Sequence, residues 1–154
     1  MDKTADSELV SQLRAKANAE PVASFLSLEL RELSPGRARV ALKVRPEHMN
    51  FNGSLFGGIV MSIADQAMAF ANNAVAFPSV ASQFNIHFIA AAGVGDELIA
   101  ECRVIKSGRR VGISEISVTN QRGKLIARAT GHHYSGELSP PLVAFDTPNF
   151  LMVN

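Results

Sequence analysis

The sequence predicts an α+β domain in which one antiparallel sheet curves around a single long helix. The most apolar stretch, residues 58–75, shows no strand-like alternation, contains no proline and is rich in alanine, which favours a closely packed helix. Alternating segments flank it on both sides, two before and four after. Because this helix is apolar on most sides, it needs more cover than a flat sheet gives, so we expect the sheet to curve.

Length and composition predict one globular domain over residues 1–154. Hydrophobic residues make up 47% of the chain and charged residues 19%, which is typical of a compact protein. The formal net charge of +1 gives no reason to expect nucleic acid as a partner. The single cysteine, Cys102, cannot form an internal disulfide, so we expect a reducing, cytoplasmic environment.

Neither a signal peptide nor a transmembrane helix is expected. The first 16 residues are polar and lack the apolar segment of a signal peptide. The apolar run 57–77 is interrupted by five polar residues, which a membrane span would not normally carry. These are Ser62, Asp65, Gln66, Asn72 and Asn73, and their spacing predicts a single polar stripe along the helix.

The first half of the chain predicts a short helix and a hairpin. Apolar residues at helical spacing indicate an amphipathic helix over residues 7–20, with Pro21 as its stop. Strands are predicted over 25–33 and 38–44. The Ser34-Pro35-Gly36-Arg37 sequence between them is typical of a tight turn.

The second half predicts an antiparallel meander of four strands, over residues 80–89, 96–106, 111–120 and 125–134. The apolar parity of the third switches between Ile113 and Ile116, so a bulge is expected near Ser114. The core of the domain should span about residues 22–136. Three prolines in the last 18 residues predict an irregular tail over 137–154.

The loop and helix start together resemble hotdog-fold acyl-CoA thioesterases. The residues that carry the resemblance are Asn50-Phe51-Asn52-Gly53-Ser54-Leu55-Phe56-Gly57-Gly58, followed by Asp65. PaaI-type members typically have histidine where this chain has Phe56. A second branch, the long- and medium-chain acyl-CoA hydrolases, has phenylalanine there, and Met61 also matches that branch. Downstream, residues 85–88, 95–98 and 107–110 look more like the PaaI-type branch.

The resemblance implies a role for three residues. Gly57 would offer its backbone N–H to the thioester carbonyl, and Asp65 would act as general base or as nucleophile. Asn50 would position the attacking water or the carbonyl oxygen. The family also implies a homodimer, often a dimer of dimers, with no cofactor other than the coenzyme A of the substrate.

Helix geometry supports two of these roles and predicts a shared site. A helix N-terminus has unsatisfied N–H groups and favours negative charge, which thioester hydrolysis develops on the carbonyl oxygen. Asp65, however, lies roughly 10–12 Å further along the same helix. Two antiparallel copies related by a twofold axis would pair Gly57 of one with Asp65 of the other, with the polar stripe facing the partner.

Other residues are candidates for substrate binding. Phe56 and Gly58 flank Gly57, and Ser82 or Gln83 could complete the site, although a solvated strand face explains Gln83, Asn85 and His87 equally well. Lys106, Arg109 and Arg110 form either an exposed turn or contacts to the phosphates of coenzyme A. His132 and His133 have no further ligands at suitable spacing, so no metal site is expected.

Simpler structural roles and other functions remain open. Asn50 could only cap its loop, and Gly57-Gly58 could only permit close helix packing. The main alternative function is a hotdog protein that binds an acyl-CoA or acyl-carrier ligand without hydrolysing it, which Phe56 in place of histidine favours. A hotdog dehydratase would need a histidine on the central helix, and residues 58–75 contain none.

Overall fold

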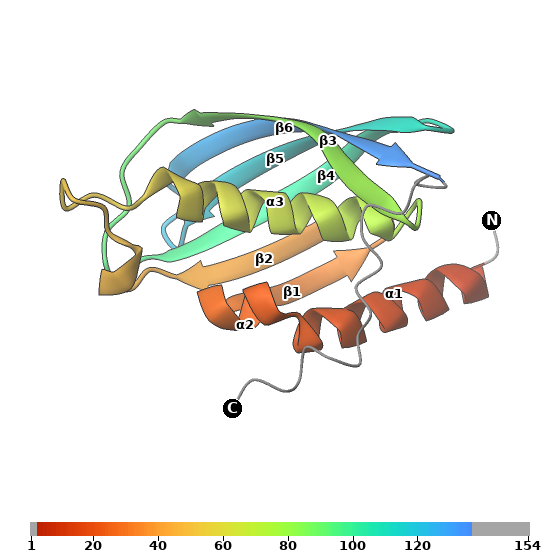
Figure 1. Cartoon of the computed structure of the whole chain (residues 1–154), viewed down its shortest axis with the longest axis horizontal. Coiled ribbons are helices and arrows are strands. Elements are labelled where there is room, and N and C mark those ends of the chain that lie inside the picture. Colours follow the sequence, from red (N-terminus) through yellow and green to blue (C-terminus); the bar gives the residue numbers. More distant parts are fainter. Residues whose placement is uncertain (1–2, 137–154) are drawn as a thin grey trace, which may run out of the picture.

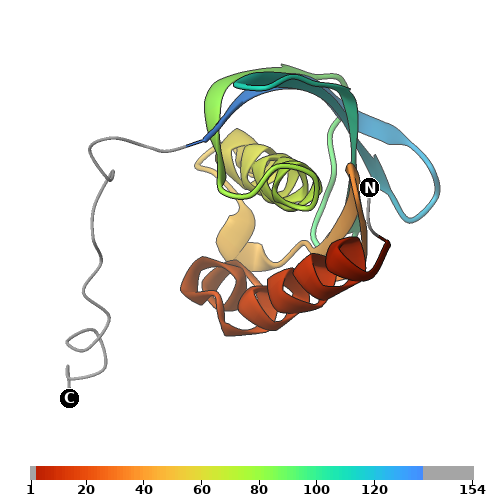
Figure 2. The ribbon, with the colours of Figure 1, turned by 90° about the vertical axis from the view of Figure 1, so that its right-hand side faces the viewer.

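In the computed structural model, which describes residues 3–136, one six-stranded antiparallel sheet curves around helix α3 (Figures 1 and 2). The tail predicted for residues 137–154 lies outside this range. The helices are α1 (Lys3–Ala19), α2 (Pro21–Leu26) and α3 (Gly57–Asn73), with a 3-10 turn η1 at Pro46–His48. The strands are β1 (Leu28–Ser34), β2 (Arg37–Lys43), β3 (Ser79–Phe88), β4 (Glu97–Ser107), β5 (Val111–Asn120) and β6 (Leu125–Ser135).

The order of strands across the sheet is β1-β2-β4-β5-β6-β3, and every neighbouring pair is antiparallel. The predicted meander is confirmed for β4, β5 and β6. It is wrong for β3, which pairs with β6 instead of β4. Because β2 pairs with β4, the β1–β2 hairpin extends the sheet beyond β4, and β1 forms one edge. Strand β3 therefore forms the opposite edge, next to α3 (Figure 1).

The first strand begins later than predicted. Pro21 does not end the helical region but starts α2, because proline is well suited to the first position of a helix. Ser27 then adopts a left-handed conformation, with φ 58°, and closes α2 before β1 begins at Leu28. The strand predicted from residue 25 is therefore wrong at its start, and Phe25 is 79% exposed.

Helix α3 fills the concave side of the sheet, as predicted. Ile63, Ala64, Ala67 and Ala71 are completely buried, and small alanine side chains allow the sheet to approach closely. None of the helices in the described range is long and apolar enough to cross a membrane.

The polar residues of α3 do not share one environment, although their spacing predicted a single polar stripe facing a partner. Asn72 is buried, and its Oδ1 accepts a hydrogen bond from Ser114 Oγ at 2.9 Å. The Gln66 side chain donates to Glu20, between α1 and α2. Asp65 alone of the three lies on the exposed side of the helix. Hydrogen bonds with the sheet and with the N-terminal segment thus divide the stripe.

The irregularity expected near Ser114 exists, but the extra residue is on the neighbouring strand. Strand β5 alternates regularly, with Ser114 buried beside Asn72. The register between β4 and β5 shifts between Val104 and Lys106, which leaves Ile105 of β4 as the additional residue. A polar side chain that is buried and hydrogen-bonded therefore produced the apparent change of parity.

Replacing Gly112 with alanine should destabilise the fold. A Cβ there would overlap the ring of His133, which is 1% exposed, and would lie 2.8 Å from the Lys106 carbonyl oxygen. Neither neighbour has room to move, so the free energy of unfolding should fall by about 1–3 kcal/mol. Chemical denaturation measures this. Gly93→Ala is the matched control, because nothing lies within 4 Å of a Cβ there. Equal stability of both variants would contradict the tight packing.

Candidate active site

The loop before α3 is built by Asn50. Its side-chain Oδ1 accepts the backbone N–H groups of Asn52 at 2.9 Å and Ser54 at 3.1 Å. The Asn50 N–H donates to the Ser54 carbonyl at 2.7 Å, and Gly53 turns the chain with φ 72°. The interpretation of Asn50 as a loop cap is therefore confirmed for its carbonyl oxygen. Its side-chain NH₂ group has no hydrogen-bond partner among residues 3–136 and is available to a substrate.

His48 holds the other side of this loop, although no motif in the sequence marks it as functional. It is buried, with 4% exposure; its carbonyl oxygen accepts the Phe56 N–H at 2.9 Å, and its Nδ1 accepts the Arg45 N–H at 3.2 Å. Burial and the nearby Arg45 charge lower the pKa of His48, so its ring is neutral near pH 7. His48 is thus a positioning residue that fixes where α3 begins.

The N-terminus of α3 carries free backbone donors. Gly57 is its first residue, and the preceding Phe56 gives no side-chain cap. Within residues 3–136, the N–H groups of Gly57 and Gly58 donate to no other backbone group. These donors and the positive end of the helix dipole suit an oxygen that gains negative charge.

Two phenylalanine rings cover the two glycines. A Cβ on Gly57 would lie 3.1 Å from Cζ of Phe88, and one on Gly58 would overlap the Phe56 ring. Both rings remain more than half exposed, at 57% and 56% respectively. Close approach to the Phe56 ring is therefore a structural reason for Gly58, whereas at Gly57 the exposed Phe88 ring would need to move by only a few tenths of an ångström. The two rings place the free N–H groups in an apolar setting.

Asp65 lies two turns further along α3 and has no fixed partner. Among residues 3–136, its carboxylate makes no hydrogen bond or ion pair at all, in contrast to the carboxylate of Asp96. Although the residue is exposed in the single chain, the surrounding protein removes enough water to raise the pKa of Asp65. An unpaired carboxylate with a raised pKa is suited to accepting a proton from water.

The remaining candidates do not gather around Gly57 within one chain. Lys106, Arg109 and Arg110 are exposed at the β4–β5 hairpin, which lies beyond the C-terminal end of α3 (Figure 1). Ser82 is the extra residue of a bulge in β3, and its Oγ donates to the His132 carbonyl at 3.2 Å. Gln83 pairs with His132 on the outer face of the sheet, away from α3.

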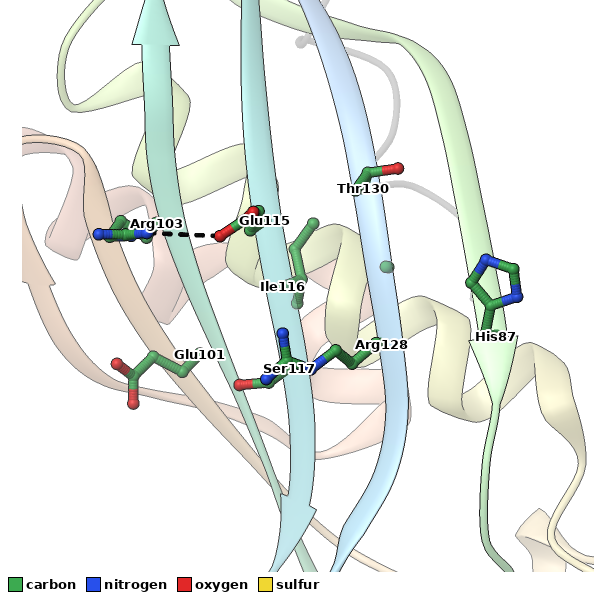
Figure 3. Close-up of a pocket in the computed structure, with 9 residues that line it drawn as sticks. His87, Glu101, Arg103, Glu115, Ile116, Ser117, Arg128 and Thr130 are labelled. Atoms are coloured by element: carbon green, nitrogen blue, oxygen red, sulfur yellow. Dashed lines mark hydrogen bonds and ion pairs between the residues drawn. The ribbon is translucent and has the colours of Figure 1, made fainter.

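A concavity of about 360 Å³ on the outer face is a poor candidate for the reaction site. Its walls are strongly polar, with Arg103 and Glu115 forming an ion pair at 3.4 Å and His87 at one side (Figure 3). It lies across the sheet from α3 and contains neither Gly57 nor Asp65. The face that includes Gln83, Asn85 and His87 is thus the outer face of the sheet.

The described residues provide neither a metal-binding cluster nor a reactive thiol. Residues 3–136 contain no group of three His, Cys, Asp or Glu side chains placed to hold a metal ion. Burial raises the pKa of the Cys102 thiol to about 12, so it stays protonated.

Comparison with known proteins agrees with this fold. The sequence profile of the Thioesterase superfamily matches residues 52–127. The acyl-coenzyme A thioesterase PaaI of Escherichia coli is 31% identical over 119 residues, which is 76% of this chain and 85% of that protein. The solved structure of the E. coli PaaI protein superposes with a TM-score of 0.77 at 29% identity and covers 83% of this chain and 94% of that chain.

This chain therefore belongs to the thioesterase superfamily, and its sheet wrapped around α3 is the hotdog fold. Within the superfamily it is PaaI-like. Human acyl-coenzyme A thioesterase 13 is also similar, with 29% identity over 129 residues, which is 82% of this chain and 89% of that protein. The expected hotdog fold and family are thus confirmed, and the site residues remain predictions.

Proposed function

We propose that this protein is an acyl-CoA thioesterase that hydrolyses an acyl-CoA to a free acid and coenzyme A, in two sites shared across a homodimer. The observation that carries the proposal is that one helix, α3, bears both a free N–H donor at Gly57 and the carboxylate of Asp65, which has no partner within residues 3–136. The names of the relatives, acyl-coenzyme A thioesterases PaaI and 13, support the choice of substrate class.

The proposed chemistry follows from these two groups. The thioester carbonyl oxygen accepts the Gly57 N–H, which stabilises the negative charge that develops as the carbonyl is attacked. Asp65 either takes a proton from the attacking water or attacks the carbonyl itself. The C–S bond then breaks, and coenzyme A leaves as a thiolate that takes up a proton. The NH₂ group of Asn50 is available to orient the water or the carbonyl oxygen.

The open edge of the sheet supports the shared site. Strand β3 pairs only with β6 among the described strands, so its other side is free to pair with a second copy. Antiparallel pairing of two β3 strands by a twofold axis makes the two α3 helices antiparallel as well. Asp65 of one copy then approaches Gly57 of the other. Met61, Asp65 and Ala69, spaced four residues apart on the exposed side of α3, would face the partner.

The same symmetry gives the basic hairpin a role. Lys106, Arg109 and Arg110 lie at the opposite end of their own α3 from Gly57, so the twofold axis brings them to the end where the partner's α3 begins. At that place they would bind the phosphates of coenzyme A, since arginine matches phosphate geometry. Ser82 and Gln83 on β3 would lie at the same interface. A dimer of dimers is compatible with this arrangement, and no other cofactor is needed.

A thiol-release assay over short, medium, long and aromatic acyl-CoAs tests the activity. We expect turnover of at least one class, which a binding protein of the same fold would not show. Saturable binding of acyl-CoA without thiol release, in the presence of the intact dimer, would instead support the non-catalytic alternative that Phe56 favours.

Complementation between two inactive variants tests the shared site. Gly57→Pro and Asp65→Asn should each be inactive alone, but a heterodimer contains one site in which both groups are intact. With random pairing, half of the dimers are mixed and half of their sites work, so co-expression should restore about one quarter of wild-type activity. A heterodimer purified with two different tags should show about one half of wild-type activity, because one of its two sites is intact. No recovery in the purified heterodimer would show that each site belongs to one chain.

A further inference from the structure

An apolar cavity of about 440 Å³ opens beside the first residue of α3. Gly57 and Val60 of the first helical turn form one wall, and Phe88 at the end of β3 forms the next. The segment Ala90–Ala92 and Ile126 of β6 also line it. Of the described residues that line this cavity, only Ser54 has a polar side chain, and none is ionisable.

The cavity and the proposed oxyanion donor share one residue. The Gly57 N–H is free, and the same residue contributes to the cavity wall. A thioester carbonyl that accepts this N–H would therefore have its carbonyl carbon beside the cavity. One substituent of that carbon is the sulfur of coenzyme A, and the other is the acyl group.

The chemistry of the wall decides which substituent fits inside. The nucleotide of coenzyme A carries several phosphates, and its pantetheine arm carries two amides, which all require hydrogen-bond partners. The described lining holds one side-chain hydroxyl and no charged side chain, so it offers few partners for the amides and no positive charge for the phosphates. Its size lies within the range of about 300–1,000 Å³ that is usual for small-ligand sites, and apolar walls favour an uncharged hydrocarbon.

We propose that this cavity binds the acyl group, and that Phe88 and the Ala90–Ala92 segment set which acyl groups fit. The inference rests on the proposed thioesterase function. Phe88 packs its ring against Gly57, and Ala91 lines the cavity as an exposed residue with only a methyl side chain. The substrate class is therefore an acyl-CoA with an uncharged, apolar acyl group that extends beyond acetyl.

Filling the cavity at Ala91 tests the assignment. Ala91→Leu and Ala91→Phe should both lower the ratio of kcat/KM for octanoyl-CoA to kcat/KM for acetyl-CoA. The larger phenylalanine should lower it more. The Phe variant should change the ratio by about tenfold or more, because it displaces several methylene groups. Val94→Phe is the matched control, because Val94 belongs to the same loop, is 55% exposed and does not line the cavity. Its ratio should equal that of the wild type.

A binding measurement separates this inference from the proposed hydrolysis. S-octyl-CoA and S-ethyl-CoA are thioethers that cannot be hydrolysed, and calorimetry gives their affinities without turnover. Ala91→Phe should lower the affinity for S-octyl-CoA about tenfold more than the affinity for S-ethyl-CoA. An unchanged affinity ratio together with an unchanged kcat/KM ratio would overturn the cavity assignment while Asp65-dependent hydrolysis stands. A changed affinity ratio with no turnover of any acyl-CoA would support the cavity and overturn the hydrolysis.

Discussion

Replacing Asp65 with asparagine is expected to lower kcat for acyl-CoA hydrolysis by about 10²–10⁴-fold, the range typical of losing a general base. The carboxylate has no partner within residues 3–136, so the substitution removes no ion pair or hydrogen bond of the fold. Asparagine keeps the size of the side chain but cannot accept the proton of water or form an acyl intermediate. Thiol release under saturating substrate measures the change.

A control carboxylate and a stability measurement make this result specific. Glu101→Gln changes the charge equally but lies on the outer face, so its kcat should remain that of the wild type. The raised pKa of Asp65 means that its stabilising contribution is present below pH 3.8 and is lost as pH rises through the folded pKa. At pH 7 the charged form costs stability, so Asp65→Asn should melt no lower than the wild type. Full activity of Asp65→Asn would contradict the assignment.

The pH dependence of kcat/KM provides an independent signature of the same residue. Only the ionised carboxylate can act as base or nucleophile, so the rate should fall on the acid side of the Asp65 pKa. Burial raises that pKa above its ordinary value of 3.8, and the acid limb should therefore appear at a higher pH than for an ordinary aspartate. Any residual activity of Asp65→Asn should lack this limb.

Local patterns predicted the elements well but not their order in space. Alternation and apolar runs located α3 and all six strands to within a few residues, because side-chain periodicity reflects burial directly. The edge position of β3 depends instead on which strand it pairs with after the chain leaves α3. That pairing is a tertiary contact, which side-chain periodicity does not indicate. Pro21 was ambiguous for a related reason, since proline both ends one helix and starts the next.

The candidate site shows the same division. The sequence placed Gly57, Gly58 and Asp65 on one helix, and α3 contains all three, because helical periodicity is a local property. Their catalytic roles stay predictions. The division of the polar stripe depends on Ser114 and Glu20, which contact α3 from distant parts of the chain. The ring of Phe88 over Gly57 is also a tertiary contact, 31 residues apart in sequence, and it carries the inference about the acyl group.

Replacing Gly57 with proline removes the proposed oxyanion donor and leaves the helix intact. Gly57 is the first residue of α3, the position at which proline is favoured, and its N–H is not needed by the helix. Phe56 already has φ −64° and ψ 126°, the extended conformation that a residue before proline adopts. We therefore expect kcat to fall by about 10²–10³-fold, as for loss of one oxyanion donor, with little loss of thermal stability.

Gly57→Ala separates the donor from the side chain. Both variants place a Cβ about 3.1 Å from the exposed ring of Phe88, which has room to shift, but only alanine keeps the N–H. If the backbone donor stabilises the developing charge, Gly57→Ala should retain most of the wild-type kcat, with any loss appearing mainly in KM. Equal losses of kcat in the two variants would instead assign the effect to crowding against Phe88, and the oxyanion role of Gly57 would have to be abandoned.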